Sequence, residues 1–125
     1  MGVTKFGEAI RKARHHTKLT LLSMATEIGV SVAYLSAIEV GRNKVPVGFV
    51  EKILAFFNEF GYQFDEDLHE LAMLSNESVP LRGLTPLHQA LVAGFANSSL
   101  SSKQLERLAK ELKKIQMMDK GQEDK

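Results

Sequence analysis

The chain has 125 residues, no cysteine, and a nearly neutral balance of 16 lysines and arginines against 15 aspartates and glutamates. That length allows one domain of ordinary size or a small domain with an extension, and the lack of cysteine excludes disulfide bridges and thiolate metal sites. No apolar run approaches a transmembrane length and residues 1–18 lack the core of a signal peptide, so we expect a soluble, cytoplasmic protein.

The first predicted helix runs from about Lys5 to Thr17. Phe6, Ile10 and Ala13 recur at the helical period and form one apolar face, while charged side chains cover the rest of the helix. We expect this face to close the core of the two helices that follow.

Residues 20–44 predict two short helices around a tight turn, followed by a cationic tail. Thr20 and Ser31 are suited to cap the two helix starts, because each hydroxyl can accept a hydrogen bond from a free N–H of the first turn. Gly29 separates the helices, where a residue able to take positive φ lets the chain reverse. Apolar residues follow both caps at helical spacing: Leu21, Met24, Ala25 and Ile28 in the first helix, and Leu35 and Ile38 in the second. This pattern is typical of helix-turn-helix geometry.

Two amphipathic helices around a glycine also occur in ordinary helical bundles. The outer face of the second helix argues against that interpretation, because it is uncharged where a solvent-exposed face would carry charge. It presents Val32, Ala33, Ser36, Ala37 and Val40. Such a surface is suited to pack into a groove of a binding partner.

Two further helices are predicted after the cationic tail. One spans about residues 47–59, with Pro46 fitting its start and Gly61 its end. A weaker one spans about residues 64–74, starting at Phe64, with its acids outward. These helices would complete a five-helix domain over residues 1–74.

Residues 75–84 interrupt the helical periodicity. They contain Pro80 and Gly83, which predicts a linker or a short extended segment. Beyond it we expect a helical hairpin over residues 85–118 and a fraying polar tail over residues 119–125.

Both helices of the hairpin have clear start signals. Thr85 and Pro86 provide a cap and a first-turn proline, and Ser101 with Gln104 forms a capping box. The hairpin carries more apolar surface than two helices can bury in each other, so we expect a second copy of the chain to cover it. The predicted dimerisation residues are Leu87, Leu91, Phe95, Leu105, Leu108, Leu112 and Ile115. The alternative is a hairpin that packs on the N-terminal domain of its own chain.

The two-helix segment also carries a spaced pattern of residue types. Its members are Thr20, Ala25, Gly29, Val30, Ser31, Tyr34, Leu35, Ile38, Glu39 and Gly41. The pattern resembles that of the lambda-repressor-like, Xre-type helix-turn-helix family over roughly residues 4–60. The sequence departs from the family at Ser23, where Glu or Gln is usual, and at Val32, Ala33 and Ala37, where many relatives have polar residues. The resemblance implies an all-α fold, with a five-helix lambda-repressor-like DNA-binding domain followed by a C-terminal helical hairpin.

The resemblance also implies roles for individual residues, because the second helix of that family lies in the major groove of DNA. The implied base-reading residues are Ser31, Val32, Ala33, Ser36 and Ala37. The implied phosphate contacts are Thr20, Tyr34, Arg42, Asn43 and Lys44. Arg14 and Glu39 align with a pair that joins the first helix to the recognition helix, so we expect them to be structural. An excess of bases over acids in residues 1–47, reversed in residues 48–100, fits DNA contact through the N-terminal half.

Metal and catalytic sites are only weakly indicated. Glu66 and His69 have the i, i+3 spacing of some metal sites, but such a site needs ligands from other helices, so we favour a solvated polar face. No nucleophile elbow or phosphate-binding glycine loop accompanies the serines and histidines. We therefore expect no enzymatic activity, no metal and no cofactor.

Two functions fit this organisation. The first is a dimeric transcriptional repressor that binds a palindromic operator in double-stranded DNA. The second is an antitoxin that binds a toxin protein through its C-terminal helices and represses its own operon. A leucine stripe serves a homodimer or a foreign partner equally well, so the sequence leaves both open.

Overall fold

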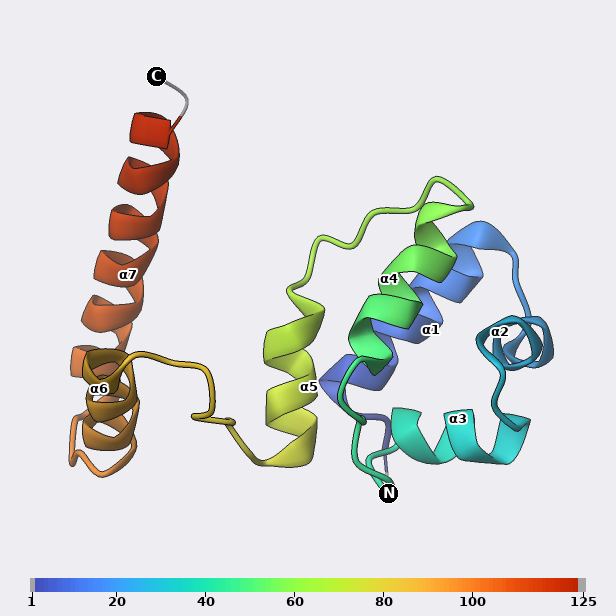
Figure 1. Cartoon of the computed structure of the whole chain (residues 1–125), viewed down its shortest axis with the longest axis horizontal. Helices are drawn as coiled ribbons and strands as arrows, with labels where there is room; N and C mark the ends of the chain where they lie inside the picture. Colours follow the sequence, from blue (N-terminus) through green and yellow to red (C-terminus); the bar gives the residue numbers. More distant parts are fainter. Residues whose placement is uncertain (1, 124–125) are drawn as a thin grey trace. The chain divides into compact units, whose positions relative to one another are not determined.

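A computed structural model describes residues 2–123 of the chain, with side chains described for residues 2–118. Within that range the protein is helical and contains no strand, which confirms the predicted all-α fold (Figure 1). The helices are α1 (Lys5–Thr17), α2 (Leu21–Ile28), α3 (Val32–Glu39), α4 (Phe49–Asn58), α5 (Leu68–Asn76), α6 (Pro86–Ala96) and α7 (Ser102–Glu123). They form two compact units: unit 1 (Met1–Pro80) holds α1 to α5, and unit 2 (Leu81–Lys125) holds α6 and α7.

Helix α1 has the bounds that its apolar period predicts. Thr4 caps its start, because the threonine hydroxyl accepts a hydrogen bond from the Gly7 N–H at 3.0 Å. Gly7 itself lies against the end of α3, where an added Cβ would stand 2.1 Å from the carbonyl oxygen of Glu39. The glycine therefore allows α1 and α3 to approach more closely than any larger residue would.

The core of unit 1 joins all five of its helices. Its central side chains are Phe6 and Ile10 from α1, Met24 from α2, Leu35 and Ile38 from α3, Ile53 and Phe57 from α4, and Leu68 and Ala72 from α5. All of them are buried. Because this cluster draws on no residue of unit 2, unit 1 is held together by its own contacts.

Helix α4 begins two residues later than predicted. Gly48 precedes it in the left-handed conformation, with a φ of 83°, and Pro46 lies in the loop before that turn. Val47 is fully exposed on the same turn. A residue with a side chain would be strained at this φ, so the chain turns at the glycine and the helix starts after it.

Helix α5 begins at Leu68, so the predicted start at Phe64 is wrong. The carboxylate of Asp67 caps the helix by accepting hydrogen bonds from the N–H groups of His69 and Glu70, at 3.0 and 3.2 Å. Phe64 lies in the preceding loop, where its ring packs edge-on against that of Phe57 with 5.4 Å between centroids. The apolar side chain at Phe64 thus reaches the core from a loop and not from a helix.

Unit 2 consists of two helices whose starts follow the predicted caps. The Thr85 hydroxyl accepts a hydrogen bond from the His88 N–H at 3.2 Å, and Ser101 and Gln104 form the capping box with distances of 2.9 and 3.2 Å. Helix α7 continues through Glu123, into the segment predicted as a polar tail, whose last two residues lie outside the described range. No residue of α6 is buried. Among the described residues, no single helix is long and apolar enough to cross a membrane.

Candidate nucleic-acid interface

Helices α2 and α3 form a tight, capped pair. Thr20 and Ser23 make a reciprocal capping box at the start of α2, in which the Thr20 hydroxyl accepts from the Ser23 N–H at 3.0 Å and the Ser23 hydroxyl accepts from the Thr20 N–H at 3.1 Å. Serine therefore serves here in place of the longer Glu or Gln. Gly29 ends α2 with a φ of 89°, and the Ser31 hydroxyl caps α3 by accepting from the Tyr34 N–H at 3.0 Å. The two helices meet at a bend of 106°, within the range of helix-turn-helix pairs.

Helix α3 has a buried face and an exposed face. Leu35 and Ile38 are fully buried in the core of unit 1. Ser31, Val32 and Ala33 are exposed at the start of the helix, and Ser36 is half-buried one turn later. An uncharged surface of small side chains thus faces away from the core.

Ala37 departs from its predicted place on the exposed face. It is only 8% exposed, so its methyl group offers little surface to a base. The N–H groups of Arg42 and Asn43 donate to the Ala37 carbonyl, at 2.9 and 3.3 Å, so the next segment folds back onto the end of α3 where Ala37 is buried.

The loop after α3 carries the cations predicted to meet phosphate. Arg42, Asn43 and Lys44 are all exposed. The loop is held from behind by Asn76, the last residue of α5: its side-chain oxygen accepts from the Val45 N–H at 2.8 Å, and its NH₂ donates to the Val45 carbonyl at 3.0 Å. These two hydrogen bonds form a clamp between residues far apart in the sequence, and no local sequence pattern predicts it.

The two remaining predicted phosphate contacts lie on either side of the turn. Thr20 is exposed at the start of α2, where its hydroxyl already serves as the helix cap. Tyr34 is half-buried, and its ring packs edge-on against that of Phe49 with 6.5 Å between centroids. Only part of the Tyr34 side chain is therefore available to a ligand.

A buried carboxylate joins α3 to α1. Glu39 is fully buried, and its carboxylate accepts hydrogen bonds from the guanidinium groups of Arg14 and Arg11. Arg14 Nη2 stands 3.3 Å from Glu39 Oε1, and Arg11 Nε stands 3.0 Å from the same oxygen. The family resemblance indicated Arg14 alone, and helical periodicity places both arginines outside the apolar face of α1. The Glu39 carbonyl also accepts from the N–H and the hydroxyl of Thr4, each at 3.1 Å, which fixes the end of α3 against the start of α1.

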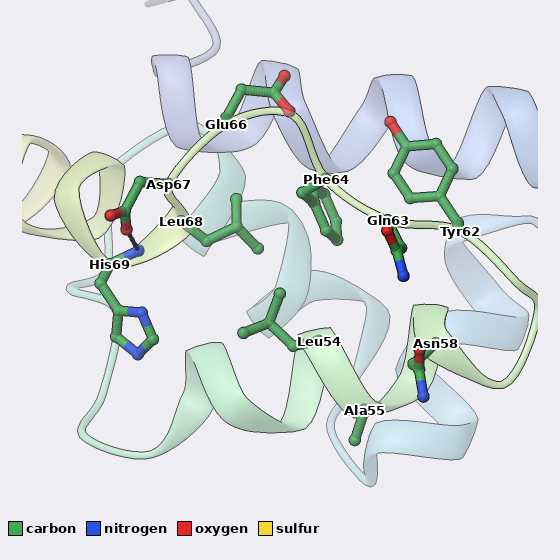
Figure 2. A pocket seen from close by; sticks show the side chains of 10 residues that line it. All are labelled: Leu54, Ala55, Asn58, Tyr62, Gln63, Phe64, Glu66, Asp67, Leu68 and His69. Carbon is green, nitrogen blue, oxygen red and sulfur yellow. Dashed lines mark hydrogen bonds between the residues drawn. The ribbon is translucent and has the colours of Figure 1, made fainter. Parts of the chain in front are cut away.

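A separate groove lies between α4 and the loop before α5 (Figure 2). It measures about 540 Å³, and the side chains of Leu54, Phe64 and Leu68 point toward one another across it. None of its lining residues belongs to α2, α3 or the loop that carries Arg42 and Lys44. The groove is therefore not part of the candidate interface.

His69, at one end of this groove, does not combine with Glu66 as a pair of metal ligands. Its Nε2 donates a hydrogen bond to Glu51 Oε1 at 2.9 Å, and this bond lowers the pKa of the exposed Glu51 carboxyl. Glu66 instead faces Lys12, with 3.9 Å between Oε2 and Nζ. Among the described side chains, no three histidines or acids gather closely enough to hold a metal ion.

Comparison with known proteins addresses the same part of the chain. A family model described as a helix-turn-helix domain matches residues 5–71, which run from the start of α1 into α5. No curated protein and no solved structure gives a significant match. The matched residues include the whole candidate interface and stop before unit 2.

Proposed function

Because the chain belongs to the helix-turn-helix domain family of DNA-binding proteins, we propose that it is a sequence-specific transcriptional regulator of the lambda-repressor-like, Xre type. The observation that carries the proposal is the pair α2 and α3, bent by 106°, with an uncharged exposed face on α3 and exposed cations in the next loop. Proteins of this kind are typically not enzymes, and the proposed role requires no catalysis.

We assign base reading to the exposed face of α3. Ser31 and Ser36 can exchange hydrogen bonds with base edges, and Val32 and Ala33 can contact the methyl group of thymine. Ala37 is left out of this set because it is buried. With so few polar groups on the helix, DNA shape supplies part of the specificity.

We assign phosphate binding to Arg42, Asn43 and Lys44, supported by Thr20 and by the exposed part of Tyr34. These contacts would fix the position of α3 in the groove and carry little sequence information. The clamp between Asn76 and Val45 supports the assignment, because it gives the cationic loop a defined position beside α3.

We further propose that the protein is a dimeric repressor of a palindromic operator, with unit 2 as the dimerisation segment. The predicted dimerisation side chains are 40% to 71% exposed within the described chain, so a large apolar surface is open to a partner. A second copy of the chain would bury it and would join two half-site contacts into one binding event.

Selection of bound sequences from a random DNA pool tests this function. We expect the selected sequences to share an inverted repeat whose half-sites lie one helical turn, or a multiple of it, apart. Selection of a single unrepeated site would contradict the dimeric mode, and failure to select any sequence would contradict specific DNA binding.

An antitoxin is the second candidate, supported by the same exposed apolar side chains of α6 and α7. In that case a toxin protein, and not a second copy, would cover them. Co-expression with the product of the neighbouring gene distinguishes the two candidates. A stable complex of both proteins that buries unit 2 supports the antitoxin. A homodimer that does not bind the neighbouring product supports the repressor.

A further inference from the structure

Helix α7 carries a charged feature in addition to its apolar residues. Lys103, Arg107, Lys110 and Lys114 follow one another at intervals of four, three and four residues, which places them on one face of the helix. We propose that these residues, the basic stripe, are a second contact surface for the phosphate backbone of DNA. The inference rests on the proposed DNA-binding function and adds a second site to it.

The basic stripe and the apolar residues occupy different sides of α7. With 3.6 residues per turn, the stripe is centred about 150° around the helix from the face that carries Leu105, Leu108, Leu112 and Ile115. A second copy of the chain that covered the apolar face would therefore leave the stripe in solvent. A dimer would present two such stripes.

The cations of the stripe are free to meet a ligand. All four side chains are exposed. Among the described side chains, none of the four forms an ion pair within 4.0 Å, although Glu106 and Glu111 flank the stripe on the same helix. Their positive charge is consequently not neutralised within the described part of the chain.

The division of charge between the two units favours DNA as the ligand. Residues 1–47 carry an excess of bases, but acids outnumber bases in unit 1 as a whole, so the net charge of that unit gives little long-range attraction for a polyanion. In unit 2, Leu81–Lys125, the balance is reversed, since eight bases stand against five acids. The net charge of unit 2 therefore supplies attraction that the net charge of unit 1 does not.

The length of the stripe suits a DNA strand. At 1.5 Å per residue, Lys103 and Lys114 lie about 16 Å apart along α7. Phosphates of one strand follow one another about every 3.4 Å along the axis of the duplex while the strand winds around that axis, so a straight helix of this length passes several phosphates of the backbone. The four long cationic side chains therefore have more than one phosphate within their range.

An anionic membrane is the competing ligand for a basic amphipathic helix. Membrane binding would require the apolar residues of α7 to enter the lipid, where they could no longer pair with a second copy. DNA leaves them free to pair, and for this reason we favour it.

The test uses the full chain with Lys103→Gln, Arg107→Gln, Lys110→Gln and Lys114→Gln combined. Its affinity for a selected operator duplex and for a random duplex of equal length is measured by fluorescence anisotropy between about 50 and 200 mM salt. We expect the slope of log affinity against log salt concentration to become shallower by about one unit for each phosphate that the stripe neutralises, up to about four units per protomer, with both duplexes weakened alike. Circular dichroism and sedimentation verify that helix and oligomer persist, since glutamine favours helices.

A matched pair of single variants provides the control. Lys110→Gln and Lys113→Gln each remove one charge from α7, but Lys113 lies off the stripe. We expect the slope to fall by about one unit for Lys110→Gln and to stay unchanged for Lys113→Gln.

Three results would overturn the inference. If the wild type binds DNA and the fourfold variant keeps its slope, the stripe does not contact the backbone, although the proposed function stands. If the stripe is needed only for binding to phosphatidylserine vesicles, its ligand is lipid. If the wild type binds neither duplex, this inference and the proposed function both fail.

Discussion

Ala33 gives the most direct single-residue test of the α3 surface, because it is exposed and cannot form hydrogen bonds through its side chain. We predict that Ala33→Glu abolishes operator binding, since a carboxylate would meet base acceptors and nearby phosphates. Glutamate is a good helix former, so loss of fold is not the expected cause. Electrophoretic mobility shift of the operator measures the effect.

The control for this substitution is Ala55→Glu, which adds the same charge to an exposed alanine on α4. This variant should bind the operator as the wild type does. Unchanged binding by Ala33→Glu would remove α3 from the interface.

Glu39 joins α3 to α1 through ion pairs of its buried carboxylate with Arg14 and Arg11. Glu39→Ala would leave the guanidinium of Arg14, whose side chain is 11% exposed, without its anionic partner. We predict a loss of about 3–5 kcal/mol in the free energy of unfolding, measured by urea denaturation. Glu27→Ala, which removes an exposed carboxylate from α2, should change stability by less than about 0.5 kcal/mol. A similar small change for Glu39→Ala would show that the buried pair contributes little.

At the scale of the element, we predict that the loop after α3 binds the DNA backbone through the charges of Arg42 and Lys44. Combining Arg42→Ala and Lys44→Ala should weaken binding to all DNA sequences. The slope of log affinity against log salt concentration should become shallower by about one unit for each phosphate that is no longer neutralised. The fold should persist, because both side chains are exposed. Lys12→Ala with Lys52→Ala removes equal charge elsewhere in unit 1 and should leave the slope unaltered. If the loop variant keeps the salt dependence of the wild type, Arg42 and Lys44 do not contact the phosphate backbone of DNA.

The clamp at the end of α5 should couple stability to binding. Asn76→Ala leaves the N–H and carbonyl of the buried Val45 without their partners, which we predict to cost about 2 kcal/mol of stability. Operator affinity should also fall, because the cationic loop loses its support. Asn58→Ala, an exposed change on α4, is the control for both measurements. If stability falls and affinity does not, the clamp serves the fold alone.

The sequence predicts best the helix boundaries that carry local signals. The bounds of α1 follow from its apolar period, and the starts of α2, α3, α6 and α7 follow from hydroxyl caps that the structure confirms. The start of α5 is not predicted, because Asp67 resembles the other outward acids in the sequence and Phe64 extends the apolar period.

Candidate-site residues that sequence reasoning missed or misplaced all depend on contacts distant along the chain or on the path of the loop. Arg11 on α1 reaches Glu39 on α3, Asn76 on α5 reaches Val45 in the loop after α3, and Ala37 is buried where the chain folds back onto the end of α3. Helical periodicity describes one element at a time, so it cannot report any of the three.

At the scale of the whole molecule, we predict that removing α7 separates DNA binding from dimerisation. Truncation after Asn97 should leave unit 1 folded, because its core ends at Ala72, and should yield a monomer with operator affinity about 100-fold weaker or more. Sedimentation velocity measures the oligomer. A truncated protein that is still a stable dimer would contradict the proposed interface.

Truncation also removes the cations of α7, so a second variant separates the two effects. Leu108→Asn with Leu112→Asn keeps every charge and should still give a monomer. Its operator affinity should fall, while its salt slope per bound protomer should stay that of the wild type. Leu74→Asn, which changes an exposed leucine of α5 outside both unit 2 and the proposed interface, is the control.

The two faces of α3 also bear on how this protein could acquire a new target. The residues that anchor the helix, Leu35, Ile38 and Glu39, are buried, whereas Val32 and Ala33 project outward and contribute nothing to the core. Ser31 is the exception on the outer side, because its hydroxyl also caps the helix. Under the proposed function, DNA sequence preference can therefore change by exchange of a few surface side chains of α3 while the core that holds the helix stays intact.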